Sequence, residues 1–218
     1  MGAVILAIDT TAEFGSIALC DGDHTVEELA IHSPDGFGHV LFQEIERLLS
    51  RHSVRPADLA CFAAASGPGS FTGVRIGLTA AKGLAENTGK PVVAVSNLRA
   101  LAFFGTAPLR AAVIDAHRGE VYAGLYNVSL EAAAPEAVLE FSRWQAALPI
   151  EAQVISCDFS TFAGAVDPGR TRITAPRALA AAIGRIAGRD LRSGRALAPE
   201  EIDANYVRRS DAELLWKG

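Results

Sequence analysis

The hydrophobic pattern changes period along the N-terminal part of the chain, and this change constrains the fold more than any other feature. Three apolar strands joined by tight turns are predicted first, at residues 3–9, 16–20 and 25–31. Helical patterns then alternate with short strands: helices at 37–50, 74–88 and 97–104, strands at 59–65 and 91–95. The order βββαβαβα predicts an α/β fold in which helices cover a mixed sheet.

The pattern restarts after a proline-containing segment at residues 106–109. Beyond it the sequence predicts three strands and a helix, at 111–115, 121–127, 152–156 and 177–187. The Ala-rich stretch 130–149 has no clear period, and the tail from Pro199 is irregular. We therefore predict two lobes, an N-terminal lobe of residues 1–106 and a smaller, abbreviated lobe of residues 107–218.

Composition indicates a folded protein of a reducing compartment. Half of the 218 residues are apolar and 21% are charged, which excludes an intrinsically disordered chain. The three cysteines form no CxxC pair, so a disulfide scaffold is not expected. The N-terminal apolar run has no basic flank and is too short for a signal peptide or a membrane span. We expect a cytoplasmic protein without membrane contact.

The most unusual segment is residues 66–78, SGPGSFTGVRIGL, which follows a predicted strand and opens a helix. Glycines at such a corner let the backbone approach a phosphate, and the helix N-terminus attracts anions. The segment lacks the G-K-[ST] ending of a Walker loop and the G-x-G-x-x-G spacing, and Ser96 ends the next strand instead of an acid. A phosphate cradle and a purely structural corner both remain open.

Asp9 ends the first strand at the turn Asp9-Thr10-Thr11. A carboxylate there can hold magnesium-bound phosphate, or it can accept a hydrogen bond within its own turn. The candidate cofactor-binding residues are therefore Asp9, Thr10, Gly67, Gly69 and Ser70.

The two longest predicted helices have more apolar surface than a helix on a sheet needs. Gly73, Gly77, Ala81 and Ala85 form a ridge of small residues, and Ile76, Ala80 and Leu84 form a second apolar line. The helix at 37–50 is also apolar over a wide arc. Either the second lobe or another chain covers these faces, and we favour another chain.

Catalytic and metal-binding patterns are missing from the sequence. No two of the five histidines have helical spacing, and there is no H-E-x-x-H or G-x-S-x-G motif. We predict no catalytic residue and no metal ligand. A polar cluster near Asp115, with His117, Arg118 and Glu120, could orient a substrate or form a salt-bridged turn.

Charge argues against nucleic-acid binding by the chain alone. The net charge is -5, although the part from residue 167 onward has 10 basic and 7 acidic residues. Arg185, Arg189, Arg192 and Arg195 could contact phosphate, but a solvated helix face is the simpler interpretation. No aromatic platform accompanies these arginines.

Four motifs and the tail carry a family resemblance. AVILAIDTTAEFGSIAL, FAAASGPGSFTGVRIGLTAAKGLA, PVVAVSNLRALA and VIDAHRGEVYAGLY resemble the bacterial TsaB family, also called YeaZ or M22 glycoprotease-like. So does the tail, with Ala204-Asn205-Tyr206-Val207-Arg208 and Asp211-Ala212-Glu213. The resemblance implies an actin-like ATPase (ASKHA, ribonuclease H-like) fold. It also implies a role in making N6-threonylcarbamoyladenosine at position 37 of tRNA.

In that pathway the TsaD paralogue transfers the threonylcarbamoyl group, TsaB is its non-catalytic scaffold and activator, and TsaE is an ATPase that binds the pair. The apolar faces of the two helices predict a homodimer when the chain is alone. The resemblance implies tRNA contact only through the complex, and room for ATP or ADP at the partner interface. The alternatives are a nucleotide-dependent enzyme of this fold, an M22-type metallopeptidase, and a direct tRNA-binding module. The sequence has no Gly-Gly dipeptide and no His-x-x-x-His pair, which favours the scaffold.

Family members pair through their first two long helices as a four-helix bundle. Carried over to this chain, the partner contacts are Phe37, Val40, Leu41, Ile45, Val74, Gly77, Leu78, Ala81 and Ala85. The chain departs from the family where Pro34-Asp35-Gly36 precedes the first helix and where Leu41-Phe42-Gln43 replaces Leu-Leu-Pro.

Overall fold

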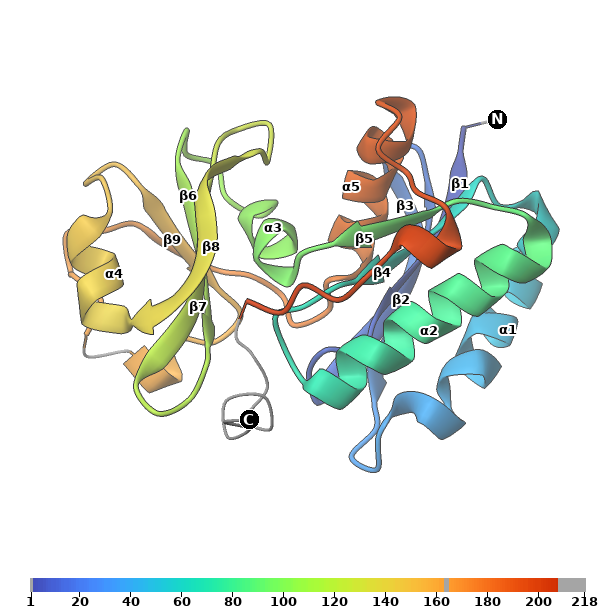
Figure 1. Ribbon diagram of the computed structural model, residues 1–218, viewed down its shortest axis with the longest axis horizontal. Helices are drawn as coiled ribbons and strands as arrows, with labels where there is room; N and C mark the ends of the chain where they lie inside the picture. The colour runs from blue at the N-terminus through green and yellow to red at the C-terminus, as the bar shows by residue number, and fades with distance from the viewer. Residues whose placement is uncertain (1, 163–164, 208–218) are drawn as a thin grey trace, which may run out of the picture. The chain divides into compact units, whose positions relative to one another are not determined.

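The computed structural model describes residues 2–162 and 165–207, which form two compact units (Figure 1). Unit 1 comprises residues 1–100 and 177–204, and unit 2 comprises residues 101–176 and 205–218. These units differ from the predicted lobes, 1–106 and 107–218, chiefly because residues 177–204 return to unit 1. Arg208 and the Asp211-Ala212-Glu213 stretch of the family tail lie outside the described residues.

Unit 1 is built on a five-stranded mixed sheet in the order β3-β2-β1-β4-β5. Its strands are β1 (Val4–Asp9), β2 (Phe14–Asp21), β3 (His24–His32), β4 (Cys61–Ala65) and β5 (Val92–Val95). β2 runs antiparallel to β1 and β3, whereas β4 is parallel to β1 and β5. The five predicted strands are confirmed to within two residues at each end, because their apolar runs and turn residues are local signals.

Helices cover both faces of this sheet (Figure 1). The helices of unit 1 are α1 (Leu41–Arg51), α2 (Phe71–Thr88) and α5 (Ala180–Arg192), and α3 (Asn97–Ala102) begins there. α1 and α2 share one core cluster with Leu6 and Ile8 of β1. α5 packs on the other face, where Gly184 lies against Ala7 and Cys20. The glycine lets the helix approach the strands closely.

The first helix begins later than predicted, at Leu41 instead of residue 37. A separate 3-10 turn, Phe37–His39, precedes it, and Gly36 before that turn has a φ of 88°. A residue with positive φ cannot continue a helix, so the Pro34-Asp35-Gly36 sequence separates this turn from the preceding chain. α2 begins three residues earlier than predicted because Ser70 caps it: its Oγ accepts from the Gly73 amide at 3.2 Å.

Distant strands cap the N-terminus of α5. Ser16 Oγ on β2 accepts hydrogen bonds from the Leu179 and Ala180 amides at 3.1 and 3.0 Å. Glu28 Oε1 on β3 accepts from the Ala181 amide at 2.8 Å, and burial raises the pKa of this glutamate. These bonds satisfy amides that α5 itself leaves unpaired, and they fasten the returning chain to unit 1.

Unit 2 repeats the strand order of unit 1. Its sheet has the order β10-β9-β6-β7-β8. The strands are β6 (Arg110–Asp115), β7 (Glu120–Tyr126), β8 (Ala132–Glu140), β9 (Gln153–Ser156) and β10 (Arg172–Thr174). β7 is antiparallel to β6 and β8, and β9 is parallel to β6 and β10, as in unit 1. The unassigned stretch 130–149 contains β8 and α4 (Phe141–Ala147).

The predicted fold class is confirmed by this topology. Each sheet has three antiparallel strands followed by two parallel ones added at the side of the first strand. This is the ribonuclease H-like arrangement of the actin-like ATPase fold. Among the described helices, none combines the length and the hydrophobicity that a membrane span requires.

Candidate functional site

The candidate site lies at the carboxyl ends of the neighbouring parallel strands β1 and β4. The turn Asp9-Thr10-Thr11 follows β1, and the Gly-rich loop (residues 66–70) follows β4. The Ser70 amide donates to the Thr11 carbonyl at 2.7 Å, which joins the two segments. The structure therefore brings all five candidate cofactor-binding residues to one edge of the sheet, where ligands of open α/β folds bind.

Asp9 is almost completely buried, with 2% of its surface exposed. Its Oδ1 accepts from the Thr11 amide at 3.0 Å and from Thr11 Oγ1 at 2.6 Å, so the carboxylate binds within its own turn. Burial raises the pKa of Asp9, although hydrogen bonds from Thr11 and Asn97 partly offset this. Buried carboxylates with a raised pKa are common at functional sites, which makes Asp9 a candidate site residue.

Asn97 is the residue of this site that the sequence analysis missed. Its side-chain oxygen accepts from the Gly67 amide at 3.0 Å, and its Nδ2 donates to Thr11 Oγ1 at 2.6 Å. The Asn97 amide donates to the Gly67 carbonyl at 2.9 Å. Asn97 therefore ties the Gly-rich loop to the Asp9 turn. The signal in the sequence was an asparagine two residues after the strand that neighbours β4, at the start of a predicted helix.

The ridge of small residues on α2 faces the chain's own backbone. A side chain at Gly73 would place its Cβ 1.9 Å from the Thr10 carbonyl oxygen, and one at Gly77 would lie 2.7 Å from Thr10 Oγ1. Thr10 Oγ1 also donates to the Gly73 carbonyl at 2.7 Å. Gly69 is equally confined, since its Cβ would lie 2.6 Å from the Thr11 carbonyl oxygen. The close approach that the ridge predicted is made by the turn after β1.

The predicted partner contacts lie mostly in the core of unit 1. Seven of the nine have buried side chains: Phe37, Leu41, Ile45, Val74, Leu78, Ala81 and Ala85. Gly77 is buried against Thr10, and Val40 is half-buried. In the isolated chain most of these residues pack into the core cluster of unit 1, while Val40, Ile76 and Leu84 are only partly buried; a partner on α1 and α2 stays a prediction. A partner could therefore reach only the outer faces of α1 and α2.

The polar cluster near Asp115 forms a hydrogen-bonded turn in unit 2. Asp115 Oδ1 accepts from the His117 amide at 2.8 Å, and Thr161 Oγ1 donates to Asp115 Oδ2 at 3.2 Å. The His117 side chain is 85% exposed and lies 3.5 Å from the same carboxylate. Asp115 thus repeats in unit 2 the position of Asp9 at the end of the first strand.

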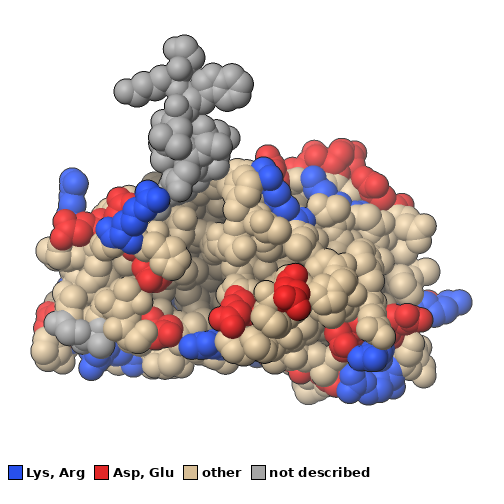
Figure 2. Space-filling view, turned by 90° about the horizontal axis from the view of Figure 1, so that it is seen from below, with Lys and Arg blue, Asp and Glu red and all other residues tan. Residues whose placement is uncertain are grey.

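The arginines near the end of α5 have acidic neighbours in the same unit. Arg189 and Arg192 lie 3.8 and 3.4 Å from Asp23, and Arg195 pairs with the buried Asp190. Basic and acidic side chains are also intermixed on the face shown in Figure 2. This intermixing weakens any attraction to a nucleic-acid backbone.

Removing the charge of Asp9 is expected to stabilise the fold at neutral pH. In Asp9→Asn the retained oxygen still accepts from Thr11, and a buried charge disappears. Because folding raises the pKa of Asp9, the stability of the native chain falls as pH rises from the ordinary Asp value of about 3.9 through the folded value. We expect Asp9→Asn to be more stable than the parent chain at pH 7, and this advantage to vanish below about pH 4.

Urea denaturation at the two pH values measures this difference, with the exposed Asp35→Asn as a control that should show no such pH dependence. An Asp9→Asn chain that is less stable at both pH values would contradict the assignment.

Comparisons with known proteins place this architecture in a family. The family described as "TsaD: tRNA N6-adenosine threonylcarbamoyltransferase" matches residues 37–188. A Bacillus subtilis protein described as tRNA threonylcarbamoyladenosine biosynthesis protein TsaB is 38% identical over 145 residues, 64% of this chain and 63% of that protein. The Escherichia coli protein with the same description is 37% identical over 127 residues, 56% of this chain and 54% of that protein. The chain thus spans between about half and just under two thirds of the length of these relatives.

Two solved structures agree over nearly the whole chain. YeaZ from Pseudomonas aeruginosa superposes with a TM-score of 0.80 at 28% identity, covering 94% of this chain and 99% of that one. A second Pseudomonas aeruginosa structure, described as similar to peptidase YEAZ, has a TM-score of 0.81 at 28% identity, with coverage of 94% and 100%. The chain therefore belongs to the family described as "TsaD: tRNA N6-adenosine threonylcarbamoyltransferase", and the curated relatives and solved structures that it resembles are named TsaB and YeaZ.

Proposed function

We propose that the chain is a non-catalytic subunit of the machinery that makes N6-threonylcarbamoyladenosine in tRNA. The descriptions of its Bacillus subtilis and Escherichia coli relatives support a place in this biosynthesis. In this proposal a TsaD-type paralogue transfers the threonylcarbamoyl group, a TsaE ATPase binds the pair, and tRNA is contacted only through the complex. The chain acts by binding and activating the paralogue.

One observation supports the non-catalytic assignment: four backbone amides of the turn, the Gly-rich loop and the start of α2 are already used inside unit 1. The amides of Thr11, Gly67, Ser70 and Gly73 each donate to an acceptor of the turn, the loop or Asn97. Pro68 has no N–H to offer. A phosphate cradle requires such N–H groups to point at the ligand. These four amides are therefore not free to hold a phosphate, and the bonds that they make anchor the Gly-rich loop and α2 to the turn after β1.

The outer faces of α1 and α2 supply the surface that such a subunit needs. Phe42 on α1 is 56% exposed and Phe71 on α2 is 40% exposed. The Arg75 guanidinium lies 3.7 Å from the centre of the Phe71 ring. Exposed aromatic and arginine side chains are enriched where proteins bind one another. We propose that the paralogue packs its helices here, and that two copies of the chain pair through the same surface when the paralogue is absent.

The test is the variant Phe42→Glu, with Val26→Glu as its matched control. Val26 is an exposed apolar residue on β3. Its replacement by glutamate also exchanges an apolar side chain for a negative charge, but outside the proposed surface. We expect Phe42→Glu to weaken binding to the TsaD-type paralogue at least about tenfold while thermal unfolding stays unchanged. Val26→Glu should bind like the parent chain.

Binding of the paralogue at full strength by Phe42→Glu would contradict the proposed surface. Tight binding of ATP and magnesium by the isolated chain, measured by isothermal titration, would contradict the non-catalytic assignment and favour a nucleotide-dependent enzyme.

A further inference from the structure

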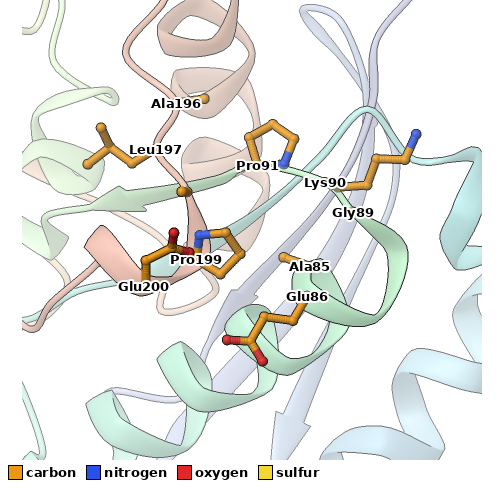
Figure 3. Close-up of a pocket in the computed structure, with 10 residues that line it drawn as sticks. Ala85, Glu86, Gly89, Lys90, Pro91, Ala196, Leu197, Pro199 and Glu200 are labelled. Atoms are coloured by element: carbon orange, nitrogen blue, oxygen red, sulfur yellow. The ribbon is translucent and has the colours of Figure 1, made fainter.

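Unit 1 contains a cavity of about 500 Å³ between the end of α2 and the segment 196–200 (Figure 3). Backbone hydrogen bonds fix both of its walls. Val92 and Leu197 exchange two N–H···O bonds of 2.9 Å, and the Lys90 amide donates to the Ala85 carbonyl at 3.0 Å. The Ala198 amide donates to the Glu201 carboxylate at 2.9 Å, which closes the turn Pro199–Glu201. The cavity is therefore preformed, as ligand sites usually are.

The walls of this cavity are largely aliphatic. Pro91, Leu197 and Pro199 are among its apolar lining residues, and Leu197 is 43% exposed although it is held at the sheet edge. Exposed apolar side chains on fixed backbone can be covered by the hydrocarbon part of a ligand. The lining therefore favours a ligand with an aliphatic body.

The charges around the cavity favour a cation. Glu86 comes from α2 and Glu200 from the turn on the opposite wall. Figure 3 shows both carboxylates on the same side of the cavity, while the Lys90 ammonium group points away from them. The C-terminal end of α2 adds a partial negative charge, and its last turn has no basic residue. An anionic ligand would meet repulsion from all three of these features.

We propose that this cavity binds a linear aliphatic diamine, protonated at both ends. Each ammonium group would pair with one of the two carboxylates, and the methylene chain between them would cover Leu197 and Pro199. A monoamine of the same length can satisfy only one carboxylate. This inference is independent of the proposed function, because it uses neither the Gly-rich loop nor the outer faces of α1 and α2.

The experiment is isothermal titration of the full chain with 1,4-diaminobutane and 1,6-diaminohexane, with butylamine as the singly charged comparison. We expect saturable binding at one site, and weaker binding of butylamine. Glu86→Gln and Glu200→Gln should each weaken the diamine about three- to fivefold, as loss of one solvent-exposed ion pair predicts. Lys90→Gln should strengthen binding, since it removes a positive charge from the lining.

Glu46→Gln is the matched control, because it removes the same charge from an exposed position on α1. Three outcomes overturn the proposal: no saturable binding of either diamine, butylamine binding as tightly as the diamines, or equal weakening by Glu46→Gln. The last result would mean that the diamine is attracted only by the net negative charge of the chain. Thermal unfolding of each variant shows whether the cavity is still folded.

Discussion

Gly73→Ala is expected to destabilise the fold by about 3 kcal/mol. The new Cβ would lie 1.9 Å from the Thr10 carbonyl oxygen and 3.0 Å from the Thr10 carbonyl carbon. Neither side can yield easily, because both atoms belong to backbone and Thr10 Oγ1 holds the Gly73 carbonyl at 2.7 Å. The higher helix propensity of alanine, worth about 1 kcal/mol, cannot offset such an overlap. Urea denaturation followed by circular dichroism measures the loss.

Gly83→Ala on the same helix is the matched control. A Cβ at Gly83 would meet no atom within 4 Å, so only the helix propensity changes. We expect this variant to be more stable than the parent chain by about 0.5–1 kcal/mol. If the two alanine variants had equal stability, the close packing of α2 against the turn after β1 would be wrong.

Asp190→Asn is expected to destabilise unit 1 by about 3 kcal/mol at pH 7. Asp190 on α5 has a side chain that is only 5% exposed, and it accepts from Arg99 at 2.5 and 3.0 Å and from Arg195 at 2.5 and 3.0 Å. Arg99 is itself mostly buried, with 17% of its side chain exposed. The amide would leave that guanidinium without its carboxylate, and a buried charge without a partner is costly.

The pH dependence gives this prediction a second readout. Burial acts to raise the pKa of Asp190, but the hydrogen bonds and charges of Arg99 and Arg195 outweigh it, so the pKa is lowered. A carboxylate whose pKa is lower in the folded than in the unfolded chain stabilises the fold at pH values above its unfolded pKa of about 3.9. This stabilisation is lost as the pH falls through the pKa of the folded chain. The difference between the parent chain and Asp190→Asn should therefore shrink as the solution is acidified below about pH 4.

Asp58→Asn is the matched control for Asp190→Asn, because it removes the carboxylate of an Arg–Asp ion pair that lies on the surface. Asp58 binds Arg55 three residues away in full solvent, and this pairing lowers the pKa of Asp58 to about 2. We expect little change in stability, because exposed ion pairs are weak. If Asp190→Asn and Asp58→Asn shifted the urea denaturation curve equally, burial of the Asp190 ion pair would not be the reason for its larger effect on stability.

The sequence predicted those parts of the fold that depend on neighbouring residues. The strands of unit 1 follow from short apolar runs and turn residues, and the order of strands and helices predicted a mixed α/β sheet. The actin-like ATPase fold was implied by the family resemblance. The start of α1 was missed because Phe37–His39 form a separate 3-10 turn inside an otherwise helical pattern. β10 has only three residues, which is too short for any period to be recognised.

The site was predicted less completely because its contacts join distant segments. Asp9 and the Gly-rich loop stand out locally, but Asn97 unites them only after β4 and β5 have paired. The ridge of small residues on α2 predicted that another segment packs closely against this helix. A sequence cannot show whether that segment belongs to another chain or, as here, to the turn at Thr10. Likewise, nothing near residue 180 reveals that Ser16 and Glu28 will cap α5.

The late return of α5 to unit 1 has a consequence for biosynthesis on the ribosome. The strands of this sheet are complete at Val95, but the helix that covers one of its faces begins only at Ala180. While the intervening residues emerge, that face is open to water and to other nascent chains, which exposes an intermediate to aggregation. Translation must therefore pass Arg192, the last residue of α5, before unit 1 can finish folding.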